Sequence, residues 1–183
     1  MQVESKSQRW QPAVIALLLG VSLMRADDGL EASTLALKGA LVTQACTIKA
    51  GDEALAIDFG AVTNADLYLN LRTVSTPIQI HLEGCNTTIG NMVTTTFSGS
   101  ESTQLPGFLA LGGTVAKGVA IGLETRGGVL LPLNVVGDRQ VLNNGANVIA
   151  FQAFIKAEPQ ALANRSIQPG QYTAVSTFTL GYP

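Results

Sequence analysis

The chain is poor in the residue types that catalysis and metal binding use most often. Its 183 residues include one histidine, two cysteines and one tryptophan, and only 13% of them are charged. An enzyme needs a nucleophile beside a base, a carboxylate pair in a cleft, or a metal site. The single histidine, His81, falls among the polar positions of a predicted strand, which favours a solvated side chain over a general base. We therefore predict no catalytic, cofactor-binding or metal-binding residues.

Positive charge is scarce as well, and it is not clustered. The chain has 11 Lys and Arg against 13 Asp and Glu, which gives a formal net charge of −2. Nucleic acids and anionic membrane surfaces both attract clustered Lys and Arg. We therefore expect no nucleic-acid partner. No apolar run after residue 24 reaches the length of a membrane-spanning helix, so we also expect no direct membrane insertion.

The first residues have the pattern of a secretion signal. A basic start (Lys6, Arg9) precedes the apolar run 12–24, which is too short to span a bilayer as a helix. Cleavage after the alanine that ends the segment 1–26 is expected, and cleavage after Ala32 is the alternative. The remaining chain is long enough for one domain with a sizeable core and too short for two.

The two cysteines, Cys46 and Cys85, both lie in the part expected to be exported. In an oxidising compartment an isolated pair most simply forms one disulfide. A redox or metal-binding pair would instead require close spacing, such as C-x-x-C, and further ligands. We therefore predict a Cys46–Cys85 disulfide.

Short strand patterns separated by Gly, Asn and Pro fill most of the exported chain. The glycines of 126–128 predict a hairpin turn between two of these runs, and 63–71 is predicted to hold one or two helical turns. Strands at regular spacing predict an antiparallel sandwich. The predicted strands are 54–62, 77–85, 91–99, 118–125, 129–136, 147–157 and 171–183.

Both ends of the exported chain carry an apolar alternation that a self-contained domain does not need. Before the first cysteine, every second residue follows a strand pattern: Ser33, Leu35, Leu37, Gly39 and Leu41. At the other end the alternation continues to the penultimate residue, through Phe178, Leu180 and Tyr182. A strand that ends the chain can leave the neighbouring position in its sheet empty, with backbone groups and part of the core uncovered.

The chain resembles the type 1-like pilins of chaperone–usher fimbriae over essentially the whole exported sequence. Each matching fragment alone is weakly specific, but the fragments occur in the order of the family. They are ALVTQACTI, IDFGAV, IQIHLEGC, TTTFSG, AKGVAIGLE, LPLN, NNGANVIAFQAFIKA and PGQYTAVSTFTLGYP.

The resemblance implies an all-β fold, an incomplete immunoglobulin-like sandwich that lacks its seventh strand and is completed by donor-strand complementation. It implies an N-terminal donor-strand extension at 27–42 and a pilin domain at 43–183. Leu35, Leu37 and Leu41 would enter pockets of a neighbouring subunit, and Gly39 would lie where the two backbones approach closely. Ser33 departs from the family, which often has an aliphatic residue there.

The implied partners are other pilin subunits, a periplasmic chaperone and an outer-membrane usher. The chaperone is expected to face the C-terminal strand at Phe178, Leu180 and Tyr182, which also forms the acceptor groove. The product is expected to pass through the periplasm to the cell surface, as a structural subunit of a fimbria that supports cell adhesion.

The competing interpretation is a secreted carbohydrate-binding β-sandwich, because tip adhesins of the pathway share this fold. Sugar sites commonly use aromatic faces, and the one tryptophan, Trp10, lies in the signal segment. An adhesin would also need a lectin domain before the pilin domain. The sequence leaves open a major or a minor (adaptor) role, to which the short extension is slightly better suited, and polymerisation or self-complementation.

Overall fold

The computed structural model describes residues 44–112 and 115–183, all of which belong to one compact unit, Leu41–Pro183. The predicted signal peptide 1–26 and the predicted donor-strand extension 27–42 lie outside the described residues. Their boundaries therefore stay predictions. The boundary at 43 for the pilin domain stays one for the same reason.

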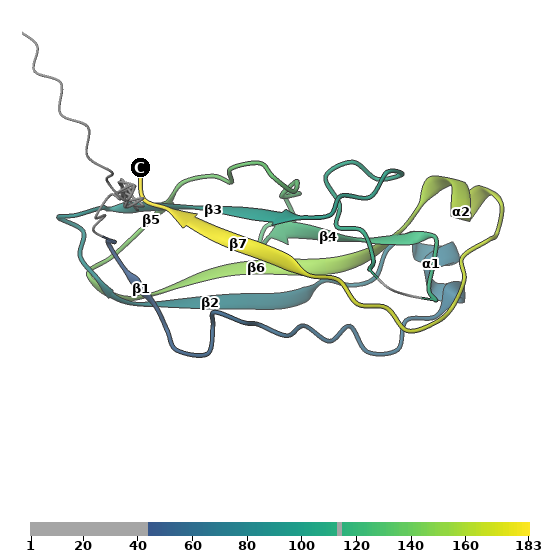
Figure 1. Ribbon diagram of the computed structural model, residues 1–183, viewed down its shortest axis with the longest axis horizontal. Coiled ribbons are helices and arrows are strands. Elements are labelled where there is room, and N and C mark those ends of the chain that lie inside the picture. Colours follow the sequence, from purple (N-terminus) through teal and green to yellow (C-terminus); the bar gives the residue numbers. More distant parts are fainter. Residues whose placement is uncertain (1–43, 113–114) are drawn as a thin grey trace, which may run out of the picture. The chain divides into compact units, whose positions relative to one another are not determined.

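The described chain forms two antiparallel sheets that pack face to face (Figure 1). Every pairing between named strands is antiparallel. This confirms the predicted all-β sandwich. The larger sheet has the order β1 (Thr47–Ile48), β2 (Thr76–Cys85), β6 (Gly145–Ala157), β4 (Val119–Thr125), and the smaller one β5 (Gln140–Val141), β3 (Met92–Gly99), β7 (Ser176–Gly181).

The core lies between the sheets and follows the predicted alternation. In β2 the inward residues Ile78, Ile80 and Leu82 are buried, while the residues between them are exposed or half-buried. Phe97 of β3 contacts Phe151 of β6 edge to face, with 5.1 Å between the ring centroids. Each such side chain contributes about 1.5–3 kcal/mol on burial, so this alternating set is what holds the sheets together.

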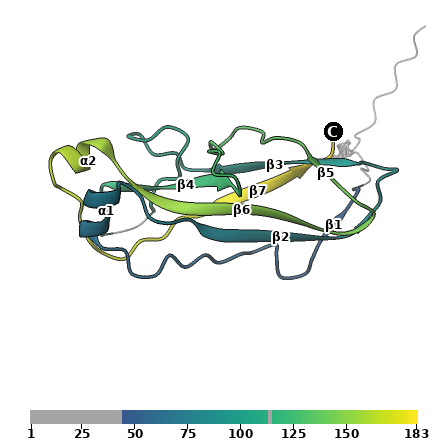
Figure 2. The same ribbon diagram turned by 180° about the vertical axis from the view of Figure 1, so that it is seen from behind.

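Two short helices lie at one end of the sandwich, and β1, β5 and the C-terminus lie at the other (Figures 1 and 2). The helix α1 (Asn64–Asn70) falls within the predicted helical segment. Its N-cap Thr63 accepts a hydrogen bond from the backbone N–H of Asp66, which satisfies one of the free donors of the first turn. The helix α2 (Pro159–Ala163) was not predicted, since five residues are too few for a helical period to be recognised.

One predicted strand, 129–136, is instead a crossing segment that closes one side of the sandwich. The N–H of Leu131 donates to the carbonyl of Leu123 on β4 (2.8 Å), and the N–H of Gly137 donates to the carbonyl of Thr95 on β3 (3.0 Å). The segment therefore leaves one sheet and joins the other. Pro132 has no N–H for a ladder and Asn134 has a φ of 62°, so a continuous hairpin strand cannot form there.

A charged network joins the chain after α1 to β4. The guanidinium of Arg72 donates to both carboxylate oxygens of Glu124, at 3.0 and 2.9 Å, and to the Oγ of Ser75. Glu124 is 4% exposed, and Arg72 also lies 3.4 Å from the ring centroid of Phe154. The hydrogen bonds from Arg72, with a further one from Ser75, hold the pKa of Glu124 below its ordinary value.

We expect Glu124→Gln to destabilise the domain by about 2 kcal/mol at neutral pH, because it removes charge-assisted hydrogen bonds from Arg72. A lowered pKa in the folded state adds stability that is present above the unfolded pKa, near 4.5, and is lost as pH falls through the folded pKa. The difference between parent and variant should therefore shrink below about pH 4.5. Urea unfolding at pH 7 and pH 3.5 measures it, and a constant difference would contradict the assignment.

Candidate functional site: the open seam and the disulfide

The side of the sandwich opposite residues 129–137 is bounded by β2 and β7, and in the described part of the chain no backbone hydrogen bond joins these two strands. Beyond Lys49, whose N–H donates to the carbonyl of His81, the chain leaves β2. Residues 54–62 then run past β2 on the side away from β6 (Figures 1 and 2). None of the backbone-to-backbone hydrogen bonds among the described residues involves 54–62. The prediction of a strand at 54–62 is therefore wrong for this chain by itself.

The edge strand β7 presents unpaired backbone groups to this side. Thr95 and Phe97 of β3 accept hydrogen bonds from residues 134–137, so their backbone groups face away from β7. Their partners across the ladder are Leu180 and Phe178. Directly opposed residues of an antiparallel pair either exchange both hydrogen bonds or turn both sets of groups outward. The N–H and C=O groups of Phe178 and Leu180 consequently point to the open side, as donors and acceptors for a further strand.

Apolar side chains along this side are only partly covered. We call the open seam the strip between residues 54–62 and residues 172–182. Its half-buried apolar residues pack against the main core but keep part of their surface accessible, and Leu55 and Ile57 are 39% and 37% exposed. The half-buried members are Phe59, Val62, Tyr172, Ala174, Phe178, Leu180 and Tyr182.

Two half-buried tyrosines show that the seam is partly removed from water. Burial raises the pKa of Tyr182. Burial also raises the pKa of Tyr172, and the carboxylate of Asp58 on the opposite rim raises it further.

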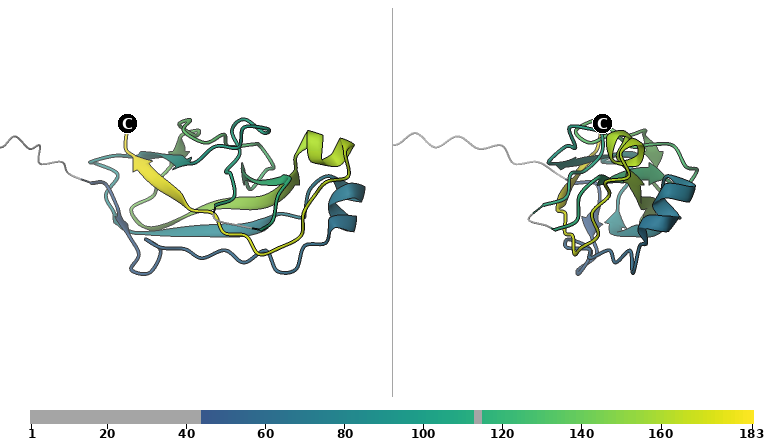
Figure 3. Two further views of the ribbon diagram at one scale, coloured as in Figure 1. Left: turned by 45° about the vertical axis from the view of Figure 1, so that its right-hand side comes forward. Right: turned by 90° about the vertical axis from the view of Figure 1, so that its right-hand side faces the viewer.

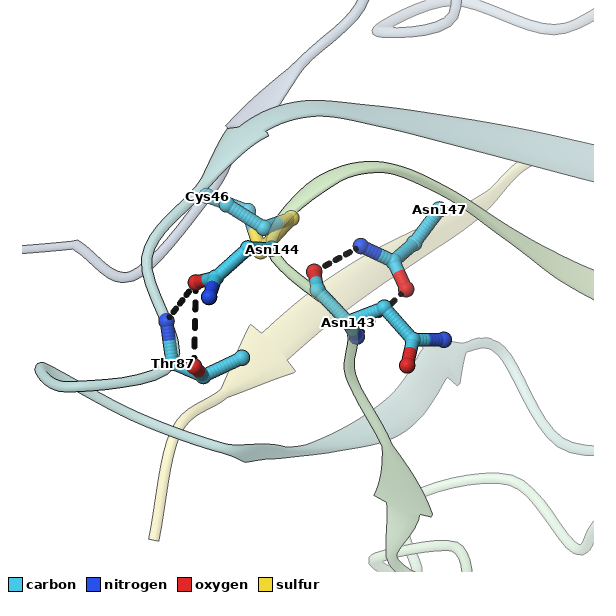
Figure 4. The surroundings of a disulfide bond; sticks show 6 residues. Cys46, Thr87, Asn143, Asn144 and Asn147 are labelled. Atoms are coloured by element: carbon cyan, nitrogen blue, oxygen red, sulfur yellow. Dashed lines mark hydrogen bonds between the residues drawn. A yellow bond between two sulfur atoms is a disulfide. The ribbon is translucent and has the colours of Figure 1, made fainter.

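The predicted disulfide between Cys46 and Cys85 is present, and both residues are buried. It joins the chain just before β1 to the end of β2, and the N–H of Asn86 donates to the carbonyl of Ala45 beside it. Figure 4 shows the surrounding amides, where Asn144 accepts hydrogen bonds from the N–H and hydroxyl of Thr87, both at 2.9 Å. The disulfide thus fixes the point where the chain enters the domain.

The three residues predicted for the C-terminal strand, Phe178, Leu180 and Tyr182, all lie along the open seam. The predicted donor residues Ser33, Leu35, Leu37, Gly39 and Leu41 lie outside the described residues. Sequence reasoning missed the second rim, Leu55, Ile57 and Phe59. The segment 54–62 is predicted only as one strand of the sandwich, and its sequence carries no signal that its backbone stays outside the ladders.

His81 is not simply solvated, as the sequence suggested. Its backbone N–H donates to Oδ2 of Asp52 at 2.6 Å, and its Nδ1 lies 2.7 Å from the same oxygen. The hydrogen bond from the backbone N–H, followed by that of the ring, lowers the pKa of Asp52. The pair attaches the turn after β1 to β2. Its role here is structural.

Features of other site types are scarce in the described part of the chain. Residues 44–112 and 115–183 contain no group of three His, Cys, Asp or Glu placed to hold a metal ion. Within the same ranges, no helix has the length and apolar character needed to cross a bilayer. A cavity of about 270 Å³ on the closed side is lined by residues that include Thr95, Arg126, Asp138 and Phe151. Phe151 is 3% exposed, so it offers no aromatic face to a sugar.

Comparison with known proteins agrees with this geometry. Residues 35–183 match the family described as "Fimbrial protein". The chain is 31% identical to the putative minor fimbrial subunit PmfF of Proteus mirabilis, over 91% of this chain and 92% of that protein. It is 32% identical to the major MR/P fimbria protein of the same organism (92% and 97%) and to the Escherichia coli fimbrial adapter PapK (82% and 88%).

Among solved structures, the P pilus rod subunit PapA superposes with a TM-score of 0.67 at 23% identity, covering 76% of this chain and all of that one. At that identity the likeness shows the fold. This immunoglobulin-like sandwich with one open side is the fold of the pilins. The chain belongs to the fimbrial protein family and is a structural subunit of a bacterial surface fimbria.

Proposed function

We propose that this subunit polymerises by donor-strand exchange through the open seam. A neighbour's N-terminal segment would add a strand beside β7, with its backbone pairing to Phe178 and Leu180. Its alternate side chains would cover Leu180 and Tyr182. The observation that carries the proposal is the combination of free backbone groups and half-buried apolar side chains on the same residues of β7. An edge strand of this kind aggregates unless a partner covers it.

The chain's own residues 33–41 are the proposed donor. They alternate Ser33, Leu35, Leu37, Gly39 and Leu41, and their nine positions match the nine residues of the exposed rim 54–62. The signal peptide 1–26, the donor extension 27–42 and the pilin domain 43–183 complete this proposed organisation. The match of the family to residues 35–183, which begins inside the extension, supports the inclusion of this segment in the functional chain.

Before assembly, the same seam would be covered by a periplasmic chaperone, which would hand the subunit to an outer-membrane usher. This route requires export through the periplasm, in keeping with the predicted signal peptide and with a disulfide, which persists in oxidising compartments. The finished fibre would support cell adhesion. The alternative of a carbohydrate-binding module is less well supported, because the relatives matched over most of their length are fimbrial subunits.

The test compares two neighbouring residues of β7. Leu180 faces the seam and is half-buried, whereas Thr179 is exposed on the opposite face of the sheet. We expect Leu180→Asp to abolish co-purification with the chaperone and the formation of SDS-resistant multimers, because a carboxylate would be buried without a partner. Thr179→Asp introduces the same charge and should leave both intact.

Disulfide formation and circular dichroism report on the fold of each variant. If folded Leu180→Asp still binds the chaperone and forms multimers, β7 is not the acceptor edge. If Thr179→Asp is equally defective, a charge on either face of β7 causes the defect. The seam is then not the surface that binds the chaperone and the neighbouring subunit.

A further inference from the structure

Three large apolar side chains are exposed at the helical end of the domain, and the core does not use them. Leu69 is 79% exposed, Leu71 52% and Val74 89%. We call these three residues the α1 pad. Single exposed apolar residues are common, but a cluster within six positions at one end of a domain marks an interaction surface.

The pad is held rigidly by the chain around it. The N–H of Thr73 donates to the carbonyl of Ile155, and the carbonyl of Leu71 accepts from the N–H of Ala157. Between the pad residues, Arg72 is fixed by its two hydrogen bonds to Glu124. Leu71 has a φ of 67°, in the left-handed region that leucine rarely adopts at a helix end. A surface ordered before binding loses little entropy when a partner docks.

The short connection between the proposed donor strand and its own domain limits which surface of the donor subunit can reach the pad. If residues 33–41 occupy a neighbour's seam, Ala45, which is 1% exposed in its own domain, is only four residues beyond Leu41. Four residues span at most about 14 Å. The donor's disulfide end, formed by residues 44–46, 85–91 and 143–147, must therefore lie against the end of the neighbour's seam at which the donor strand finishes.

Strand direction decides which end that is. Every named strand pair of the domain is antiparallel, the pairing that is slightly more stable per residue. A donor antiparallel to β7 finishes beside residues 172–176, at the end of the seam where the rim 54–62 enters α1 through Thr63. The N–H of Ile167, nine residues before β7, donates to the hydroxyl of Tyr68 in α1. Figure 3 shows both helices at that end.

A parallel donor would bring two disulfide ends together, at the point where the neighbour's own extension leaves its domain. An antiparallel donor instead brings opposite ends together, and such a head-to-tail contact generates a fibre when it repeats. The disulfide end also carries no charge that would lose its hydration against an apolar surface, while its amides and hydroxyls make it polar. Residues 84–100 and 142–152 contain no charged side chain, and Ile89 at that end is 49% exposed.

We infer that the α1 pad is the docking surface for the disulfide end of a second copy of this chain, the copy whose extension fills the seam. This rests on the proposed function and adds a second contact to it. The donor strand would provide the connection, while the pad would fix the angle between successive subunits.

The test is a cross-link within multimers of the full exported chain. A variant carrying both Val74→Cys and Ile89→Cys has its new cysteines at opposite ends of one molecule, so a disulfide between them must join two copies. We expect oxidised multimers to stay linked after boiling in SDS and to separate on reduction. The matched variant, Val129→Cys with Ile89→Cys, uses another exposed valine, 61% accessible, which lies on the closed side of the sandwich outside the pad. It should separate on boiling without reduction.

A second measurement removes the pad. Leu69→Asp with Val74→Asp should still give multimers that resist SDS without heating, because the seam is intact, but their dissociation in urea should be about tenfold faster. If the Val74→Cys, Ile89→Cys variant forms multimers that carry no cross-link between these cysteines, or if the Asp variant dissociates at the parent rate, the docking surface alone is overturned. A parent chain that forms no multimers overturns the docking surface and the proposed function together.

Discussion

Replacing both Leu35 and Leu37 by Asp should stop the subunit from donating to its neighbour while leaving its own domain folded. Burial of two leucines contributes about 3–6 kcal/mol to the joint at about 1.5–3 kcal/mol each. The change removes that contribution and places two carboxylates where the partner offers apolar pockets. Burying an unpaired carboxylate is so unfavourable that the joint should open before the charge is accommodated.

The same residues precede the disulfide, so the double variant should still form the Cys46–Cys85 bond and still co-purify with the chaperone. Thr34→Asp with Ala36→Asp is the matched control, because these residues alternate with the leucines and would face away from the seam. The measurement is the ladder of SDS-resistant multimers on unheated gels. If the Leu35/Leu37 variant polymerises normally, or loses its own fold, the donor assignment fails.

Removal of the disulfide by Cys46→Ser with Cys85→Ser should have the largest effect on the stability of the domain itself. The bond closes a loop of 39 residues. The chain-entropy relation gives about 4 kcal/mol for a loop of this length. Since small domains are stable by only about 5–15 kcal/mol, this is a large fraction of the total. The cysteines are also buried, so polar serine side chains in their place add a further penalty.

Urea unfolding of the isolated domain, with and without the bond, measures the effect. The control is the parent protein treated with a reductant, which breaks the bond but keeps both cysteine side chains. We expect it to lose most of the stability that the double variant loses. A double variant whose unfolding midpoint matches that of the oxidised parent would show that the bond is dispensable.

The strands that cross the middle of the core could be predicted from the sequence. In 77–85, 91–99 and 147–157 the alternation of apolar and polar residues matches β2, β3 and β6. One face of each is buried, and a shift by one residue would expose the whole apolar set, so local pattern and tertiary packing favour the same structure. The disulfide followed from there being two cysteines in an exported chain.

The segments at the edges could not be predicted in the same way. Residues 54–62 and 129–136 are both rich in apolar residues and were predicted as strands, yet neither forms one of the named strands of the domain. Alternation records which side chains face the core, but it does not record whether a neighbouring strand is present to accept the backbone hydrogen bonds. Residues 129–136 cross between sheets, and 54–62 lie beside an edge that no described residue of the chain pairs.

By itself, the sequence determined which residues enter the core, where the chain is cross-linked and to which family it belongs, because these depend on residue type and spacing. The tertiary structure decided which backbone groups stay unpaired and which apolar residues stay uncovered. The open side between residues 54–62 and β7, the Arg72–Glu124 network and the exposed Leu69, Leu71 and Val74 all depend on contacts between residues distant in the chain. The position of a residue in the apolar pattern predicts on which face of a strand or helix it lies. Only the packing of the other elements determines whether that face is covered.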